Sequence, residues 1–258
     1  MELTRDAFLG GRLWLHQPVR GQRAGSDAAL LAAAVPAQPG ERVAELGAGC
    51  GPALLALAAR VPGTIGLGLE IDAELVGLAN RNARENRLEG QVHFIEGDVA
   101  SLPGSLAPGS FDHVLMNPPF FDAARSRISP DPARARARSA RVGANAVWID
   151  AARALLRPGG WLTMIHRMER EAELIDLLED GFGAVRLLAL RPGGLRPDRP
   201  AKRLILLARK GASGAPRRLP ELVLHRSDGS YTDAVEAILR QAHPLDLGAR
   251  AAGEAKEA

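Results

Sequence analysis

The sequence predicts an α/β fold in which seven strands form a mostly parallel sheet, closed by an antiparallel C-terminal pair, with helices on both faces. Between residues 42 and 210, short apolar segments alternate with amphipathic ones, a pattern typical of βαβ units. A glycine-rich turn follows the first apolar segment, where a doubly wound sheet binds its ligand. The chain has 258 residues, of which 46% are hydrophobic, and this is enough for one large domain with its own core.

The expected strands are short apolar runs set between turn signals and helical patterns. They span residues 42–46, 65–70, 91–95, 111–116, 161–166, 184–190 and 203–209. The last two are expected to form the closing antiparallel pair.

The expected helices are recognised by their apolar spacing and by the residues at their ends. The first begins at Pro52, where the missing N–H of proline costs nothing, and it directs Leu54, Leu55 and Leu57 toward a core. A later helix ends at residues 157–160, Arg-Pro-Gly-Gly, which is a helix-stop and turn signal. Further helices are expected over residues 73–86, 146–156 and 169–179.

The two flanks fall outside this alternation. Ser26 and Asp27 are suited to cap a helix over residues 28–35, residues 221–225 predict a short strand, and Thr232 is suited to cap the last helix. The expected organisation is an N-terminal extension or edge hairpin over residues 1–25, a central domain over 26–210, a C-terminal strand-helix extension over 211–250, beginning with a linker over 211–220, and a flexible tail over 251–258.

Composition excludes several classes of protein. The single cysteine, Cys50, forms no intrachain disulfide, and the six histidines lack the spacing of zinc ligands, so we expect no metal and a reducing, cytoplasmic setting. Cys50 is interpreted as a small apolar filler, with a reactive thiol as the alternative. No apolar run approaches the ~20 residues of a membrane span, and no signal peptide is recognised, so no membrane association is expected. The oligomeric state is not predicted.

Arginine carries most of the positive charge, and the formal net charge is +3. Six arginines stand between residues 125 and 141 against the single acid Asp131, which predicts a positively charged loop. Such a loop either clamps phosphates or is only solvated. The arginines expected to bind RNA are Arg125, Arg127, Arg134, Arg136 and Arg138.

The glycine-rich turn, Glu-Leu-Gly-Ala-Gly-Cys-Gly over residues 45–51, is the first candidate binding element. Glycines there let a ligand approach the backbone closely. A dinucleotide fingerprint needs Gly or Ala five residues after its first glycine, where this chain has Pro52. The spacing therefore disfavours a nicotinamide cofactor.

Two acids follow the next two strands. Glu70 ends the second strand, where a carboxylate can accept both hydroxyls of a ribose, although a solvated strand-end acid is the alternative. Asp98 follows the third strand, where a turn-forming residue is one interpretation. Glu70 taken alone does not identify a cofactor, since nicotinamide-dependent enzymes also use a carboxylate at this position.

Asn117-Pro118-Pro119-Phe120 directly follows the fourth strand. The two prolines remove two donors and fix the backbone, so the Asn117 amide oxygen and the Pro118 carbonyl form a rigid pair of acceptors for a planar amino group. Phe120 offers a flat apolar face for the same substrate. These four residues are the candidate catalytic residues, and the alternative is a simple strand end with Phe120 in the core.

Residues 45–51 resemble motif I of class I S-adenosylmethionine-dependent methyltransferases, and residues 117–120 resemble the [DN]PP[YFW] motif of the amino-methyltransferases among them. The resemblance covers about residues 26–210 and implies a Rossmann-like methyltransferase sheet that binds S-adenosyl-L-methionine. It also implies methyl transfer to an amino group of adenine, cytosine, guanine or protein glutamine. The cofactor-binding residues that it implies are Glu45, Gly47, Ala48, Gly49, Gly51, Glu70, Ile71, Asp98, Val99 and Asn117.

A more specific resemblance is to the bacterial tRNA(Val) adenine-N6 methyltransferase family. It rests on residues 21–23, 27–31, 117–120, 133–136 and 228–232, although Gln22 stands where that family has an aromatic residue. It implies adenine N6 in tRNA as the acceptor and RNA as the partner. The alternatives are a protein glutamine or small-molecule acceptor, a nicotinamide-dependent oxidoreductase, and a catalytically silent RNA-binding module.

Overall fold

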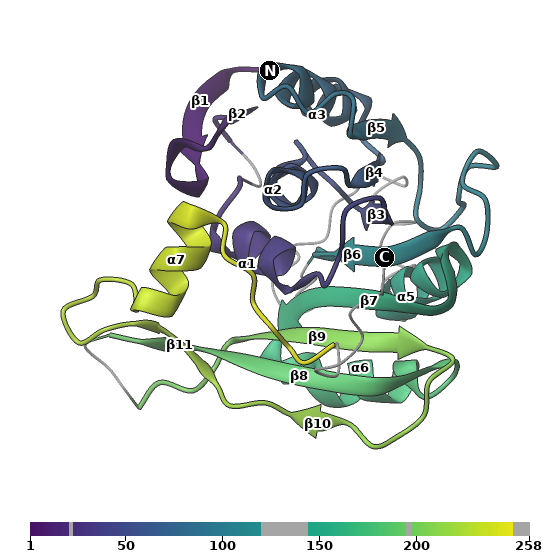
Figure 1. Ribbon diagram of the computed structural model, residues 1–258, viewed down its shortest axis with the longest axis vertical. Coiled ribbons are helices and arrows are strands. Elements are labelled where there is room, and N and C mark those ends of the chain that lie inside the picture. Colours follow the sequence, from purple (N-terminus) through teal and green to yellow (C-terminus); the bar gives the residue numbers. More distant parts are fainter. Residues whose placement is uncertain (21–22, 120–143, 195–197, 250–258) are drawn as a thin grey trace, which may run out of the picture.

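A twisted β-sheet separates two layers of helices (Figure 1). The computed structural model describes residues 1–20, 23–119, 144–194 and 198–249, and the predicted tail over 251–258 lies outside them. The strands of the main sheet are β3 (Arg42–Leu46), β4 (Ile65–Glu70), β5 (Val92–Glu96), β6 (Phe111–Met116), β7 (Leu156–Arg167), β8 (Phe182–Gly193), β9 (Arg203–Lys210), β10 (Arg217–Arg218) and β11 (Leu222–His225). Their order is β10-β8-β9-β7-β6-β3-β4-β5, and β11 also pairs with β8.

The predicted mostly parallel sheet and its antiparallel pair are confirmed. Strands β3 to β7 run parallel, and β9 lies antiparallel between β7 and β8. The predicted number of seven strands is wrong, because the described part of the sheet has nine. Short strands β10 and β11 add in parallel to the outer edge of β8, which is 12 residues long and would otherwise expose its backbone.

Residues 157–160 do not form the predicted turn. Helix α5 (Ala144–Leu155) ends before them as expected, but the chain continues directly into β7. The pairing of β7 with β6 shifts register between Phe111 and His113, so the Pro-Gly-Gly segment is an irregular start of a strand.

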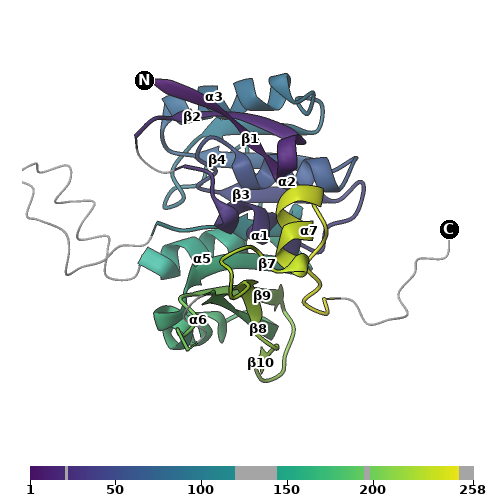
Figure 2. The same ribbon diagram turned by 90° about the vertical axis from the view of Figure 1, so that its left-hand side faces the viewer.

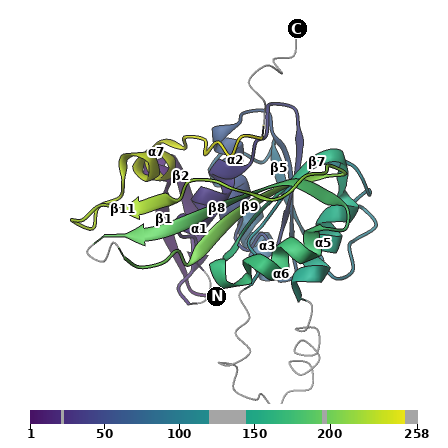
Figure 3. The same ribbon diagram turned by 90° about the horizontal axis from the view of Figure 1, so that it is seen from below.

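Helices cover both faces of the sheet, as predicted (Figure 3). One core cluster packs α1 (Ser26–Ala34), α2 (Pro52–Arg60), α3 (Ala73–Glu85) and α7 (Asp233–Gln241) on one face, and a second packs α5 and α6 (Glu171–Leu178) on the other. Successive residues of β9 alternate between the two clusters, with Leu204 and Leu206 in the second and Ile205 and Leu207 in the first. The buried sheet is therefore apolar on both sides.

The N-terminal segment forms the predicted hairpin but not at an edge of the main sheet. Strands β1 (Leu3–Phe8) and β2 (Leu13–Pro18) form a separate antiparallel sheet, joined through a 3-10 turn at Leu9–Gly11. The hairpin lies beside α3 (Figure 2). The edge of β2 that faces away from β1 is bonded by the side chains of Asn82 in α3 and Asn86 at its C-cap, and not by a third strand.

Two predicted helix caps differ in the structure. The N-cap of α1 is Gly25, and the carboxylate of Asp27 instead accepts from Arg203 Nε at 3.1 Å. Thr232 is the N-cap of α7, but its hydroxyl donates to the Val223 carbonyl at 2.9 Å and makes no cap bond. In both places the side chain that was predicted to cap the helix makes a hydrogen bond to a distant part of the chain instead.

Lys210 closes the C-terminal end of α5. Its partly buried ammonium donates to the carbonyl oxygens of Arg153, at 2.6 Å, and Leu156, at 2.7 Å. Carbonyls at a helix end lack intrahelical donors, so a cation there satisfies them and complements the helix dipole.

We expect Lys210→Met to lower the free energy of unfolding by about 1–3 kcal/mol, because two carbonyls lose a charged donor. Denaturant unfolding measures the change. Lys202→Met is the matched control, because Lys202 is exposed and directly precedes β9, the strand that ends with Lys210. Equal losses in the two variants would contradict the assigned role.

Candidate functional site

The strand order reverses between β3 and β6, which makes this the switch point of the sheet. Leu46 at the end of β3 is the register partner of Met116 at the end of β6, so the glycine loop and Asn117 leave the sheet side by side. Glu70 at the end of β4 is likewise the partner of Glu96 at the end of β5. Parallel pairing thus brings together segments that are far apart in the sequence.

A cavity of about 1170 Å³ opens at this edge. Of the predicted cofactor-binding residues, all except Gly51 line it, and so do three of the four candidate catalytic residues. The predicted residues in its wall are Glu45, Gly47, Ala48, Gly49, Glu70, Ile71, Asp98, Val99, Asn117, Pro118 and Pro119. Phe120 and the predicted RNA-binding arginines Arg125, Arg127, Arg134, Arg136 and Arg138 lie outside the described residues.

The glycines of the loop serve different purposes. Gly47 has φ +67°, and a Cβ on it would lie 2.5 Å from the indole of Trp148. Gly51 is the N-cap of α2, and a Cβ there would lie 2.7 Å from the Phe94 ring, so packing requires a glycine at this position. It does not line the cavity, and its role at the cofactor stays a prediction. A Cβ on Gly49 would meet no atom within 4 Å, so this glycine faces open space.

Glu70 is held by the backbone around it. Its Oε2 accepts from the Gly49 N–H at 2.8 Å, and its Oε1 accepts from the N–H groups of Ile71, at 2.9 Å, and Asp72, at 3.1 Å. A carboxylate has about four acceptor positions, so about one remains for a ligand. This leaves room for one ribose hydroxyl, whereas the sequence suggested two.

Glu45 lies beneath the loop with 3% of its surface exposed. Its Oε2 accepts from the Leu54 N–H at 3.0 Å, which belongs to the first turn of α2 and has no intrahelical acceptor. Burial, with a smaller contribution from the charge of Glu70, raises the pKa of Glu45 to about 8. Glu45 therefore fixes the helix start and is mostly protonated at neutral pH.

Asp98 lies at the cavity wall and also makes a turn contact. Its Oδ1 accepts from the Ala100 N–H at 2.8 Å, as in a turn.

Cys50, in the glycine loop, is buried. Burial raises the pKa of its thiol to about 11, which keeps the thiol protonated and agrees with a packing role. No cluster of metal-ligating side chains occurs among the residues that the structure describes.

Asn117 carries an unsatisfied acceptor. Its Oδ1 is buried and has no hydrogen-bond partner within the described part of the chain, and the residue lines the cavity. A buried acceptor without a donor costs about 1–3 kcal/mol, so such groups mark the place of a ligand or water. The unpaired acceptor makes the Asn117 carboxamide a candidate partner for a donor on a ligand of the cavity.

Other residues of the cavity wall were not recognised from the sequence as site residues. Trp148, on α5, is half-buried against Gly47, and Val147 beside it is 37% exposed. The remaining additions include Arg20, Arg23, Asp27 and Arg167. Arg23 and Asp27 lie in segments that support the family resemblance, but neither was predicted to be a site residue. The fold of the N-terminal segment, of α5 and of the end of β7 brings these residues to the cavity.

Comparison with known proteins matches residues 22–193 to the methyltransferase small domain. A release factor glutamine methyltransferase of Rhodospirillum rubrum is 36% identical over 183 residues, and the match covers 68% of this chain but 53% of that protein. A tRNA1(Val) (adenine(37)-N6)-methyltransferase of Aeromonas hydrophila is 30% identical over 213 residues, covering 82% of this chain and 86% of that one. The crystal structure of a protein from Agrobacterium tumefaciens, described as a predicted O-methyltransferase, superposes with a TM-score of 0.71 and 26% identity, covering 85% and 98%.

Gly47→Ala should lower the free energy of unfolding by about 1–3 kcal/mol, because the new Cβ overlaps the Trp148 indole and the left-handed φ strains any other residue. Denaturant unfolding measures it. In a Trp148→Leu background the steric part of the loss should disappear and the strain should remain. An unchanged loss in that background would contradict the contact.

Glu45→Gln should remove a pH dependence of stability. Between its usual pKa of 4.5 and the raised value of about 8, the folded protein retains a proton that the unfolded chain has released, so the stability falls as pH rises through this window. The glutamine variant lacks this loss, so its stability relative to the wild type should increase as the pH rises from 5 to 8. The increase should reach a few kcal/mol, at about 1.4 kcal/mol per unit of pKa shift. Unfolding of the ligand-free protein at pH 5 to 9 checks this, and a constant difference between the two proteins would contradict it.

Proposed function

The chain belongs to the methyltransferase small domain family and is an S-adenosylmethionine-dependent methyltransferase, and we propose that it methylates N6 of an adenine in tRNA. The observation that carries the proposal is the buried, unpartnered Oδ1 of Asn117 at the wall of the cavity. An amino group is a donor of the kind that this oxygen lacks. Pro118 cannot donate from its own backbone, so the segment after Asn117 offers acceptors without a competing donor.

The residues around the cavity fit the cofactor. Glu70 retains an acceptor position for a ribose hydroxyl, and Ile71 and Val99 add apolar side chains beside Asp98. Ile71 is 65% exposed, which suits a residue that a flat adenine would cover. Gly49 lets the ligand approach the backbone of the loop, since no side chain stands there. Bound S-adenosylmethionine supplies a methyl group activated by a positively charged sulfur.

Asn117 and Pro118 would prepare the acceptor nitrogen. The lone pair of an adenine amino group is delocalised into the ring, which makes it a poor nucleophile. Hydrogen bonds from both N–H groups to the Asn117 amide oxygen and the Pro118 carbonyl favour a pyramidal nitrogen with its lone pair free. The nitrogen loses a proton after it gains the methyl group, so no strong base is needed before attack. The indole of Trp148 and the ring of Pro119 give apolar surfaces for a planar base.

The choice of tRNA rests on similarity and charge. The Aeromonas hydrophila tRNA methyltransferase is matched over most of both chains. Arg20, Arg23 and Arg167 line the cavity, and arginine forks suit phosphates. The arginines between residues 125 and 138, which are expected from the sequence to bind RNA, follow Asn117 closely in the sequence and would add to this positive charge. A tRNA acceptor also places the protein in the cytoplasm.

Protein glutamine is the second candidate acceptor. It is favoured by the 36% identity to the Rhodospirillum rubrum release factor glutamine methyltransferase. A glutamine amide also presents a planar amino group, so Asn117 and Pro118 suit it equally well. The match covers only 53% of that protein, which makes it the weaker candidate.

Asn117→Ala should reduce methyl transfer by at least 100-fold, because the amino group loses an acceptor needed in the transition state. Affinity for S-adenosylhomocysteine, measured by calorimetry, should change much less. Asn117→Asp, which keeps an acceptor oxygen, should retain more activity than the alanine variant. Full activity of Asn117→Ala would contradict the proposed role.

The acceptor is tested by incubating the protein with labelled S-adenosylmethionine and either total bacterial tRNA or purified release factor. We expect label in tRNA, and N6-methyladenosine in nucleosides analysed by mass spectrometry. Label in the release factor alone would favour the glutamine candidate.

A further inference from the structure

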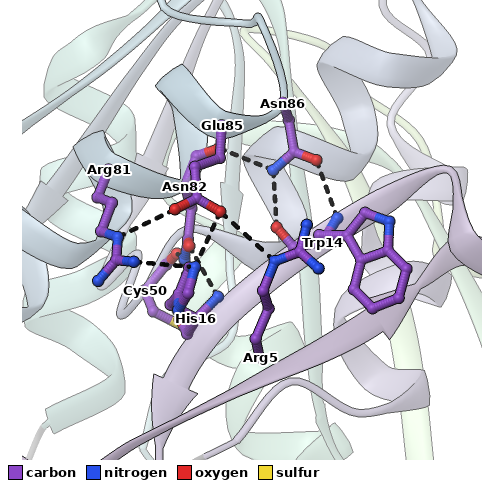
Figure 4. Close-up of polar contacts among 8 residues, drawn as sticks. All are labelled: Arg5, Trp14, His16, Cys50, Arg81, Asn82, Glu85 and Asn86. Carbon is purple, nitrogen blue, oxygen red and sulfur yellow. Dashed lines mark hydrogen bonds and ion pairs between the residues drawn. The ribbon is translucent and has the colours of Figure 1, made fainter.

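Two carboxamides, from Asn82 of α3 and from Asn86 at its C-cap, bond the N-terminal hairpin to the body of the protein (Figure 4). The Asn82 Oδ1 accepts from the His16 N–H at 2.8 Å, and its Nδ2 donates to the His16 carbonyl at 3.0 Å. Asn86 binds Trp14 in the same way, at 2.9 and 2.8 Å. Each side chain therefore bonds the free edge of β2 as a residue of a neighbouring strand would.

The spacing of these residues explains why the arrangement works. Residues four apart on a helix are separated by about 6.0 Å along its axis, and residues two apart on a strand by about 6.6 Å. The spacing between Asn82 and Asn86 along the helix is thus close to the spacing between Trp14 and His16 along β2. Both strand residues direct their N–H and carbonyl groups to the edge of β2 that faces these asparagines. A slip of the strand by one residue would turn the wrong backbone groups toward α3, so the two carboxamides fix the position of the hairpin along the helix.

Asn82 also binds the glycine loop. Its Nδ2 donates to the Cys50 carbonyl at 3.0 Å, and the side chain is completely buried. One amide group thus holds both the hairpin, through His16, and the loop, through Cys50. Because a buried amide that loses its partners is costly, both contacts favour a single arrangement.

The open end of the same hairpin reaches the cavity. Met1, Pro18 and Arg20 line it, as does Arg23 just beyond the hairpin. Arg23 is held to the hairpin by the Asp6 carboxylate, at 2.8 Å, among other contacts. The hairpin therefore meets the ligand site twice, through its own residues and through Asn82.

The charged groups around this contact are peripheral. Glu85 pairs with His16 at 2.8 Å, with Arg81 at 3.1 Å and with Arg5 at 3.6 Å, and both arginine side chains are about half exposed (Figure 4). Exposed ion pairs contribute little to stability. The hairpin is held by apolar packing, since Leu9, Leu13 and Leu15 are buried in the main core cluster. The two carboxamides add the polar contacts that fix its position along the helix.

We propose that Asn82 is a positioning residue for the cofactor, which couples docking of the N-terminal hairpin to the conformation of the glycine loop. Cofactor binding orders the loop and, through the Asn82 amide, stabilises the docked hairpin. By thermodynamic reciprocity, the docked hairpin strengthens cofactor binding by the same factor. The inference goes beyond the proposed acceptor and does not depend on it.

Hydrogen exchange on the wild-type protein tests the coupling directly. Saturation with S-adenosylhomocysteine should slow exchange of the amides over residues 3–18 at least threefold, together with those of the glycine loop. Cofactor-dependent protection confined to the loop would overturn the proposal while leaving the methyltransferase assignment intact. This measurement needs no variant, so it decides the question even if substitutions at Asn82 prevent folding.

Substitutions separate coupling from simple stability. Asn82→Ala should weaken S-adenosylhomocysteine binding about tenfold, measured by calorimetry, and should abolish the cofactor effect on hairpin exchange. Asn80→Ala is the matched control, because Asn80 lies on the same helix and makes the same two-way backbone pairing, with Phe94 of β5 instead of the hairpin. Asn80→Ala should lower the free energy of unfolding by about as much as Asn82→Ala does. It should leave the Kd for S-adenosylhomocysteine within threefold of the wild-type value, and the cofactor should still slow exchange in the hairpin. Equal losses of affinity in the two variants would overturn the proposal.

Discussion

The parallel pairing of β3 with β6 is the constraint on which the site depends. Because the order of the sheet reverses between these strands, the loops that leave their carboxyl ends diverge and leave room for the cavity. The pairing of Leu46 with Met116 places the glycine loop beside Asn117, although 70 positions separate the strand ends in the sequence. Backbone hydrogen bonds between these two strands therefore determine which segments, and with them which side chains, meet at the cavity.

Side chains then hold the glycine loop from several directions. Glu70 accepts from the Gly49 N–H, Glu45 accepts from Leu54 just after the loop, and Asn82 donates to the Cys50 carbonyl. A loop of glycines has little conformational preference of its own, so its shape must come from such partners. Glu45 illustrates the cost, since a carboxyl group buried this deeply is stable mainly in its protonated form.

The sequence predicted the central sheet well, and it placed the candidate site residues at strand ends that the structure brings to one cavity, because both follow from local patterns. Apolar runs and glycine-rich turns report strands and the loops after them, so Glu70, Asp98 and Asn117 were found from their positions at strand ends. The location of the hairpin, the packing role of Gly51 and the place of Trp148 at the cavity were not predicted. Each depends on a contact between distant segments, such as Gly51 with Phe94 or Trp148 with Gly47, that leaves no periodicity in the sequence.

The pairing of Asn80 with Phe94 occupies backbone groups on an outer strand of the sheet. Strand β5 ends the sheet, and a bare outer strand invites another chain to extend it into a larger aggregate. Asn80 occupies the N–H and carbonyl of Phe94 in the middle of that strand, so an incoming chain would find the central bonding positions already taken. A single helical carboxamide thereby covers the middle of this edge strand, at the end of the sheet opposite the short strands β10 and β11.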